Sequence, residues 1–153
     1  NIPYALNEPH LIINPKNPQH LLVAAIVTTE WVEGQSPKSY IVLLQSFDGG
    51  NNWQERHFSK NVIQGSDPWL SMNKKGTLIL TALIKMKNST TMNLITFIFI
   101  DQGKNWEVNY LDLGFAHDRQ TVVIEPKTDN FIIASAKSNP NQEEKNLWGL
   151  MIT

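Results

Sequence analysis

The sequence contains no cysteine, and this absence excludes several kinds of chemistry. Without thiols the chain can form no disulfide bond, no zinc site built on thiolates and no cysteine nucleophile. Its histidines show no spacing typical of metal ligands, so we expect neither a bound metal nor another cofactor. The four histidines are His10, His20, His57 and His117.

Basic residues and long apolar runs are also scarce. Lysine and arginine number 13 against 14 acidic residues, so the formal net charge is −1, and the only arginines are Arg56 and Arg119. No basic cluster is present that would attract nucleic acid, and none is expected as a partner. No apolar stretch is long enough to span a bilayer; Asn93–Ile100, for example, has the length of a strand, so we expect no membrane insertion.

Short runs rich in Val, Ile, Leu and Phe alternate with turn-forming clusters such as NPKNPQ, DGGNN and NKKG. This pattern is typical of an all-β protein and shows almost no helical periodicity. The expected strands are Leu11–Ile13, Leu21–Thr28, Tyr40–Gln45, Gln54–Phe58, Leu70–Met72, Thr77–Lys85, Asn93–Ile100, Glu107–Leu111, Thr121–Ile124, Phe131–Ala136 and Leu147–Ile152.

These strands form a repeat. Three segments align, and each opens with a carboxylate: Glu8, Asp67 and Asp118. A period near 50 residues with four short strands per unit predicts the blades of a β-propeller. We expect a first blade over about residues 8–60, a second over about 66–112 and an incomplete third over about 117–153, in one domain.

A propeller closes with about four to eight blades, so about three four-stranded blades make only a partial ring. Their two outer faces would be apolar and open to water. We therefore expect the remaining blades, or a second copy of the chain, to complete the ring. A three-blade unit that masks its own ends is the alternative.

One turn carries the most specific motif. In SFDGGNNW, we expect Asp48 to accept backbone N–H groups, Ser46 to tie the strand to the loop, and Gly50 to take a positive φ. Trp53 is expected to pack between neighbouring sheets. The segment FIDQGKNW repeats the pattern with Asp101, Gly103 and Trp106, but has Phe99 in place of the serine.

The turn resembles the Asp box, S-x-D-x-G-x-x-W, of the bacterial neuraminidase repeat found in sialidase-like propellers. The resemblance extends to NEPHLIINPKNPQHLLVAA and SDPWLSMNKKGTLILTA, which look like the first two strands of such blades. It implies an all-β, sialidase-like β-propeller from a secreted or cell-envelope bacterial protein, with the Asp boxes as structural turns far from the ligand face. The first residue, Asn1, is consistent with a processed or trimmed chain.

The candidate site residues stand at the openings of the three repeats. Glu8, Asp67, Asp118 and the adjacent Arg119 are expected to ring one mouth of the propeller channel, as catalytic candidates. His10 and Trp69, two residues after their carboxylates, are expected to contribute to binding, with Trp69 stacking on a sugar. The alternative is that each carboxylate only accepts backbone N–H bonds where its strand begins, with Asp118 and Arg119 as a local ion pair.

Sialidases hold the carboxylate of their substrate with three arginines, and this chain has two. The complete arginine triad is therefore absent, and Asn1 stands where the family has an arginine. Three functions remain open: glycan binding, part of a glycoside hydrolase completed by further blades, and a non-catalytic scaffold for protein–protein interaction or assembly. Trp31, in the insertion Thr28–Ser39, is a further candidate for the binding face, with an ordinary exposed loop as the alternative.

Overall fold

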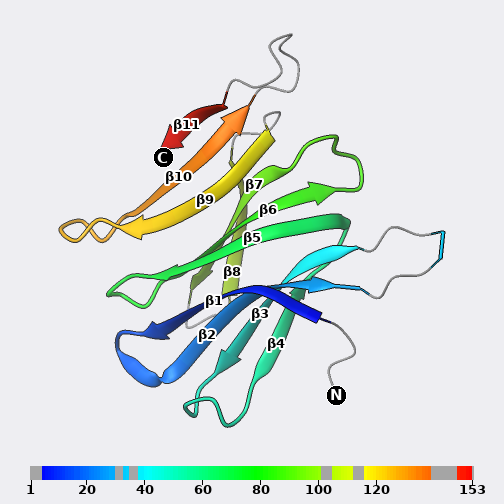
Figure 1. The fold of residues 1–153 in the computed structure, drawn as a ribbon. Coiled ribbons are helices and arrows are strands. Elements are labelled where there is room, and N and C mark those ends of the chain that lie inside the picture. Colours follow the sequence, from blue (N-terminus) through cyan, green and yellow to red (C-terminus); the bar gives the residue numbers. More distant parts are fainter. Residues whose placement is uncertain are drawn as a thin grey trace.

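The computed structural model describes residues 5–29, 33–34, 38–100, 105–111, 116–138 and 148–152. These residues form an all-β structure of three antiparallel sheets (Figure 1). No helix occurs in this described part of the chain, so none there is long and apolar enough to cross a membrane. The strands are β1 (Ala5–Asn14), β2 (Asn17–Thr28), β3 (Ser39–Ser46), β4 (Gln54–Phe58), β5 (Val62–Met72), β6 (Leu78–Met86), β7 (Asn93–Ile100), β8 (Asn105–Leu111), β9 (Ala116–Ile124), β10 (Phe131–Ser138) and β11 (Trp148–Ile152).

Each sheet is a meander in which consecutive strands pair. The first sheet has the order β1-β2-β3-β4, the second β5-β6-β7-β8, and the third contains β9, β10 and β11 in that order. Every expected strand is present. Short polar turns connect many of the strands, as the turn chemistry of the sequence predicts.

The first strand of each sheet begins earlier than predicted. β1, β5 and β9 start at Ala5, Val62 and Ala116, whereas the apolar runs suggested Leu11, Leu70 and Thr121. The extra residues mix polar and apolar side chains without regular alternation, and in β1 and β5 they include a proline, so their sequence does not predict a strand. Pro9 and Pro68 fit because each lies at a bulge, where the ladder is interrupted and an N–H group is not required.

The same bulge recurs in all three first strands. Two residues lie opposite one on the second strand of the sheet: Glu8 and Pro9 in β1, Asp67 and Pro68 in β5, Arg119 and Gln120 in β9. The first bulge residue is left-handed each time, with φ of 49° at Glu8, 50° at Asp67 and 49° at Arg119. Residues other than glycine seldom adopt this region, so the repetition marks equivalent positions.

This geometry corrects the predicted alignment by one residue. Arg119, and not Asp118, occupies the position of Glu8 and Asp67. The sequence aligned three carboxylates because Asp118 immediately precedes the bulge and no other acidic residue lies near it. In the third sheet the repeated position therefore carries a cation.

Two apolar cores join the sheets. Between the first and second sheets, buried side chains such as Leu22, Leu43, Leu80 and Phe97 form one large cluster. Between the second and third sheets a smaller cluster contains Leu83, Leu94, Val122 and Ile133. β5 also contacts both β1 and β9, so the three first strands lie side by side on one face of the molecule (Figure 1).

The outer faces of the first and third sheets expose apolar side chains. Leu11 and Ile13 of β1 are each 55% exposed, and Val123 of β9 is 54% exposed. Alternation along a strand turns these side chains away from the second sheet, because their neighbours Ile12 and Val122 pack in the cores. The described residues thus leave apolar surface on both sides of the three-sheet stack.

Candidate functional site

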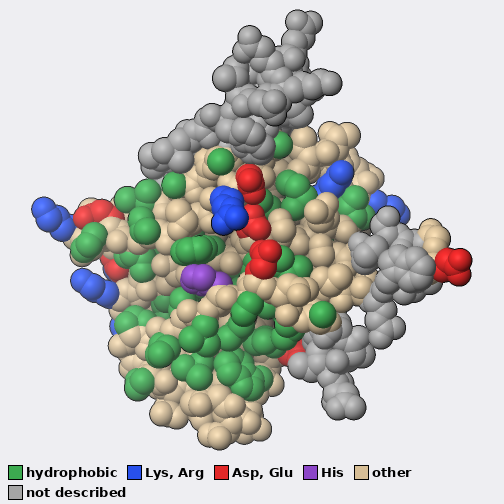
Figure 2. All heavy atoms as spheres, viewed as in Figure 1, with side chains coloured by type: hydrophobic (Ala, Val, Ile, Leu, Met, Phe, Trp, Pro, Cys, Tyr) green, Lys and Arg blue, Asp and Glu red, His purple; other side chains and the backbone are tan. Residues whose placement is uncertain are grey.

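A pocket of about 660 Å³ opens where the first strands of the three sheets lie side by side. Figure 2 shows acidic side chains gathered in the middle of this face, next to a basic side chain and a histidine. The pocket is lined by Glu8, Pro9, His10, Asp67, Pro68, Trp69, Asp118, Arg119, Gln120 and Thr121. The structure therefore brings together six of the seven predicted catalytic and binding residues; the seventh, Trp31, lies outside the described residues.

The bulges explain why these side chains meet. Each bulge interrupts the regular alternation of its strand, and the residues of all three bulges line the same pocket. Backbone strain of about 1–3 kcal/mol is typical of such left-handed residues, which are found preferentially at functional sites. Glu8, Asp67 and Arg119 are thus presented to one pocket by three copies of the same local geometry.

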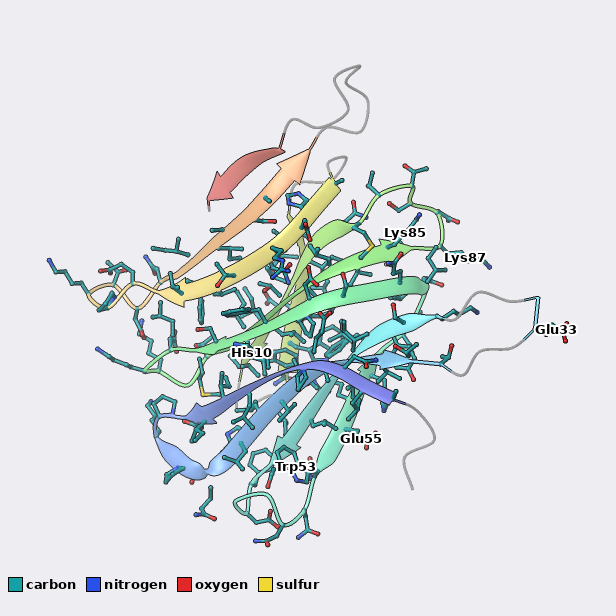
Figure 3. The ribbon with its side chains drawn as sticks, in the orientation of Figure 1. His10, Glu33, Trp53, Glu55, Lys85 and Lys87 are labelled. Carbon is teal, nitrogen blue, oxygen red and sulfur yellow. The ribbon has the colours of Figure 1, made fainter. Side chains whose placement is uncertain are left out.

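His10 and Trp69 form one wall of the pocket. Their ring centroids are 4.3 Å apart at an interplanar angle of 30°, and the Leu70 backbone N–H donates to His10 Nδ1 at 3.1 Å. Figure 3 shows His10 between β1 and β5. Burial lowers the pKa of His10, so its ring is neutral at pH 7.

Trp69 differs from the free sugar platform that the sequence suggested. It is only partly exposed and packs against the core cluster between the second and third sheets. Because His10 covers part of the indole, the surface offered to a ligand is the combined His10–Trp69 pair. Each aromatic side chain comes from a different sheet, so the wall bridges two sheets.

The carboxylates of the pocket have different surroundings. Asp67 Oδ2 accepts the backbone N–H of Arg119 at 3.3 Å, which links the second and third sheets. The side chains of Glu8 and Asp118 accept no hydrogen bond from the described residues, and both are exposed. Asp67 thus accepts a backbone N–H group, as the structural alternative predicted for each carboxylate, but the donor lies in β9 of the neighbouring sheet and not where its own strand begins.

The predicted ion pair between Asp118 and Arg119 is absent. No ion pair within 4 Å joins these two side chains. Both side chains are exposed and remain available to a ligand in the pocket.

Sequence reasoning missed Gln120. It lines the pocket, is only 3% exposed, and donates from Nε2 to the backbone carbonyl of Asp67. Its Oε1 atom is buried and has no hydrogen-bond partner among the described residues. Gln120 stands in the position of Pro9 and Pro68, and only the corrected alignment of the bulges would have drawn attention to it.

The two arginines lie in different places. Arg119 lines the pocket, whereas Arg56 belongs to β4, where its guanidinium lies 5.8 Å from the centre of the Phe99 ring.

The described residues hold no group of three or more acidic or histidine side chains placed to bind a metal ion.

The turn from Ser46 to Trp53 has the geometry predicted for it. Ser46 Oγ donates to Asp48 Oδ1 at 2.8 Å and accepts the N–H of Gly50 at 2.8 Å. Asp48 Oδ1 also accepts the Asn52 N–H at 2.9 Å, and Gly50 has a φ of 97°. Hydrogen bonds from Asn52 and Ser46 lower the pKa of Asp48 to about 2.

Trp53 does not pack between sheets as expected. It is 41% exposed, its Nε1 donates to the Gly50 carbonyl, and it lies at the end of the first sheet remote from His10 (Figure 3). Trp106, at the matching place in the second sheet, is equally exposed at 41%, but its ring centroid lies 5.5 Å from that of Phe58 in the first sheet. Trp53 lacks such a contact because no described sheet precedes the first one. Asp101 and Gly103 lie outside the described residues.

A comparison with models of protein families and with curated protein sequences found no match. The interpretation of the site therefore depends on its own geometry and chemistry.

Proposed function

We propose that this chain binds a glycan in the pocket formed by β1, β5 and β9, as part of a sialidase-like β-propeller. The observation that carries the proposal is the convergence of three bulged strands on one pocket. That pocket combines charged side chains with an aromatic wall.

The propeller interpretation is supported by how the sheets repeat. All three are meanders, they pack face to face through apolar cores, and their first strands lie side by side. A propeller places the first strand of each blade at its central channel in this manner. On this interpretation the pocket is part of the channel mouth, and the Ser46–Trp53 turn is on the periphery.

A glycan suits the composition of the pocket. Sugars present hydroxyl donors to carboxylates, and the apolar faces of their rings pack on aromatic side chains. Glu8 and Asp118 carry acceptors that no described residue uses, and the His10–Trp69 pair supplies the apolar wall. The volume of about 660 Å³ also falls in the range typical of small-ligand sites.

Binding can be tested by filling the pocket. Thr121→Trp places a large ring in the lining, whereas Asn109→Trp places the same ring on the exposed surface of β8. Calorimetric titration with a panel of oligosaccharides should show binding to the unmodified chain and to Asn109→Trp, and none to Thr121→Trp. Equal binding by both variants, or no binding to the unmodified chain, would contradict the proposal.

A glycoside hydrolase is the second candidate, and the free carboxyl groups favour it. Glu8 and Asp118 share the pocket without hydrogen bonds from other described residues, and most glycosidases use two carboxyl groups. Chromogenic aryl glycosides test this candidate. Turnover that disappears in Glu8→Gln or Asp118→Asn would support hydrolysis, whereas turnover that persists in both variants would count against these residues as catalytic groups.

The outer faces support a partial ring. Leu11, Ile13 and Val123 are more than half exposed on the faces turned away from the second sheet. We infer that further blades or a second copy of the chain cover these faces; a scaffold would use them to bind another protein. Light scattering with intact mass spectrometry should find an assembly larger than one 17.4 kDa chain. A stable monomer would contradict closure by a second copy.

A further inference from the structure

The charge of the pocket restricts the kind of glycan that it can hold. Its lining carries three carboxylates, from Glu8, Asp67 and Asp118, and one guanidinium, from Arg119. His10 adds no positive charge at pH 7, because burial lowers its pKa. The lining is therefore negative, and an anionic sugar would meet more repulsion than attraction in it.

The free hydrogen-bonding groups of the pocket are mostly acceptors. The Glu8 and Asp118 carboxylates accept no hydrogen bond from the described residues, and carboxylates offer only acceptors. A ligand that complements them must bring donors, and an ammonium group brings three donors together with a positive charge.

Gln120 is an independent observation that points in the same direction. Its side chain is 3% exposed, its Nε2 is used by the Asp67 carbonyl, and its Oε1 remains without a partner in the described part of the chain. A buried acceptor without a donor costs about 1–3 kcal/mol. Because Oε1 is itself buried, a ligand donor reaches it only when the Gln120 amide turns toward the pocket that this residue lines; such a donor would then remove that cost.

We propose that the pocket selects a cationic amino sugar, a hexosamine with a free ammonium group, over neutral and anionic glycans. This inference rests on the proposed glycan-binding function and specifies its ligand class. The ammonium group lies among the carboxylates, and the ring packs against the His10–Trp69 wall. Arg119, at the third bulge, donates to the hydroxyl oxygens of the sugar.

Three trisaccharides that share one linkage and differ only at the second carbon of each sugar provide the test. They are the trimers of glucosamine, N-acetylglucosamine and glucose, and a sialylated trisaccharide serves as the anionic probe. Titrations use a buffer of low ionic strength at pH 7, at which the charge balance of the lining described above applies and a substantial part of the amine is protonated. We expect the glucosamine trimer to bind about tenfold more tightly than the neutral trimers, as one additional charged hydrogen bond would give.

Matched variants separate the pocket from general surface charge. Asp118→Asn and Glu8→Gln remove one carboxylate each from the lining and should reduce the preference for the amine severalfold. Glu107→Gln removes an exposed carboxylate from β8, outside the pocket, and should leave the preference unchanged. An equal reduction in all three variants would show a surface-charge effect and overturn the inference.

The outcomes distinguish this inference from the proposed function. Equal affinity for the glucosamine and glucose trimers, or tighter binding of the sialylated probe, would overturn the charge selectivity and leave glycan binding intact. No binding of any probe would overturn both. Thermal unfolding of each variant shows whether it is folded, and the two single carboxylate variants provide independent readings of the same effect.

Discussion

The three left-handed bulge residues allow a stability test in which the usual effect of glycine is reversed. At an ordinary strand position, glycine is less favourable than alanine by about 0.5–1 kcal/mol, because it loses more conformational freedom on folding. At a left-handed position, a residue with a Cβ atom carries a steric cost of about 1–2 kcal/mol that glycine avoids. Glu8 and Arg119 each have a φ of 49°. The glycine variant at either position should therefore have a larger free energy of unfolding than the alanine variant.

Glu8 is well suited to this comparison. Its exposed side chain accepts no hydrogen bond from the described residues, so Glu8→Ala and Glu8→Gly remove the same side-chain contacts and differ in backbone preference. Subtracting the ordinary cost of glycine from the relief of steric strain leaves an advantage of about 0.5–1 kcal/mol for Glu8→Gly. For a chain of this size, that corresponds to about 1–4 °C in Tm.

Urea unfolding of the alanine and glycine variants at Glu8 and at Arg119 measures the difference. Leu11 provides the control, because it lies in the same strand as Glu8, is 55% exposed and lacks a positive φ. There the glycine variant should be less stable than the alanine variant by about 0.5–1 kcal/mol. If the alanine variant is also the more stable one at Glu8 and at Arg119, these residues are not held in the left-handed region. The conclusion that they occupy equivalent positions in their sheets would then be wrong.

Three further predictions concern the Ser46–Trp53 turn and the core. Ser46→Ala should lower the free energy of unfolding by about 1–3 kcal/mol in urea titrations, because the Gly50 N–H loses its buried acceptor. The control, Ser59→Ala at an exposed serine, should change this free energy little. The pKa of Asp48 is lowered from 3.8 to about 2, so its stabilising effect is complete above pH 4 and is lost as the pH falls through 2. Asp48→Asn should therefore flatten the plot of unfolding free energy against pH over that range. An unchanged plot would contradict this assignment. Phe58→Ala should lower the free energy of unfolding by about 3–5 kcal/mol in urea, because this ring is 6% exposed and its centroid lies 4.4 Å from that of Phe97 in the second sheet. A loss below about 1 kcal/mol would show that the contact between the two sheets contributes little.

The sequence predicted the parts of the fold that depend on local chemistry. Alternating apolar runs and turn residues indicated the strands, and the Ser46–Trp53 turn formed the hydrogen bonds expected of it. Such turns depend on side chains that bond to neighbouring backbone, so a short stretch of sequence is sufficient to predict them.

Features that depend on pairing between strands were harder to predict. The bulges at Glu8, Asp67 and Arg119 arise from register against the second strand of each sheet, which one strand's sequence does not reveal. The alignment therefore chose Asp118, the nearest acidic residue, in place of Arg119. Trp53 differed for a similar reason. Its hydrogen bond to the Gly50 carbonyl is local, but a packing contact like that of Trp106 with Phe58 requires a neighbouring sheet.

NMR chemical-shift mapping with the glucosamine trimer tests the location of the site most directly. Backbone amides of residues 8–10, 67–69 and 118–121 line the pocket, although Pro9 and Pro68 have none to observe. We expect the trimer to shift the resonances of these three segments together, which would show that the three bulged strands form one binding site. Shifts confined to residues 46–53, or to the region around Phe58 and Trp106, would contradict that conclusion.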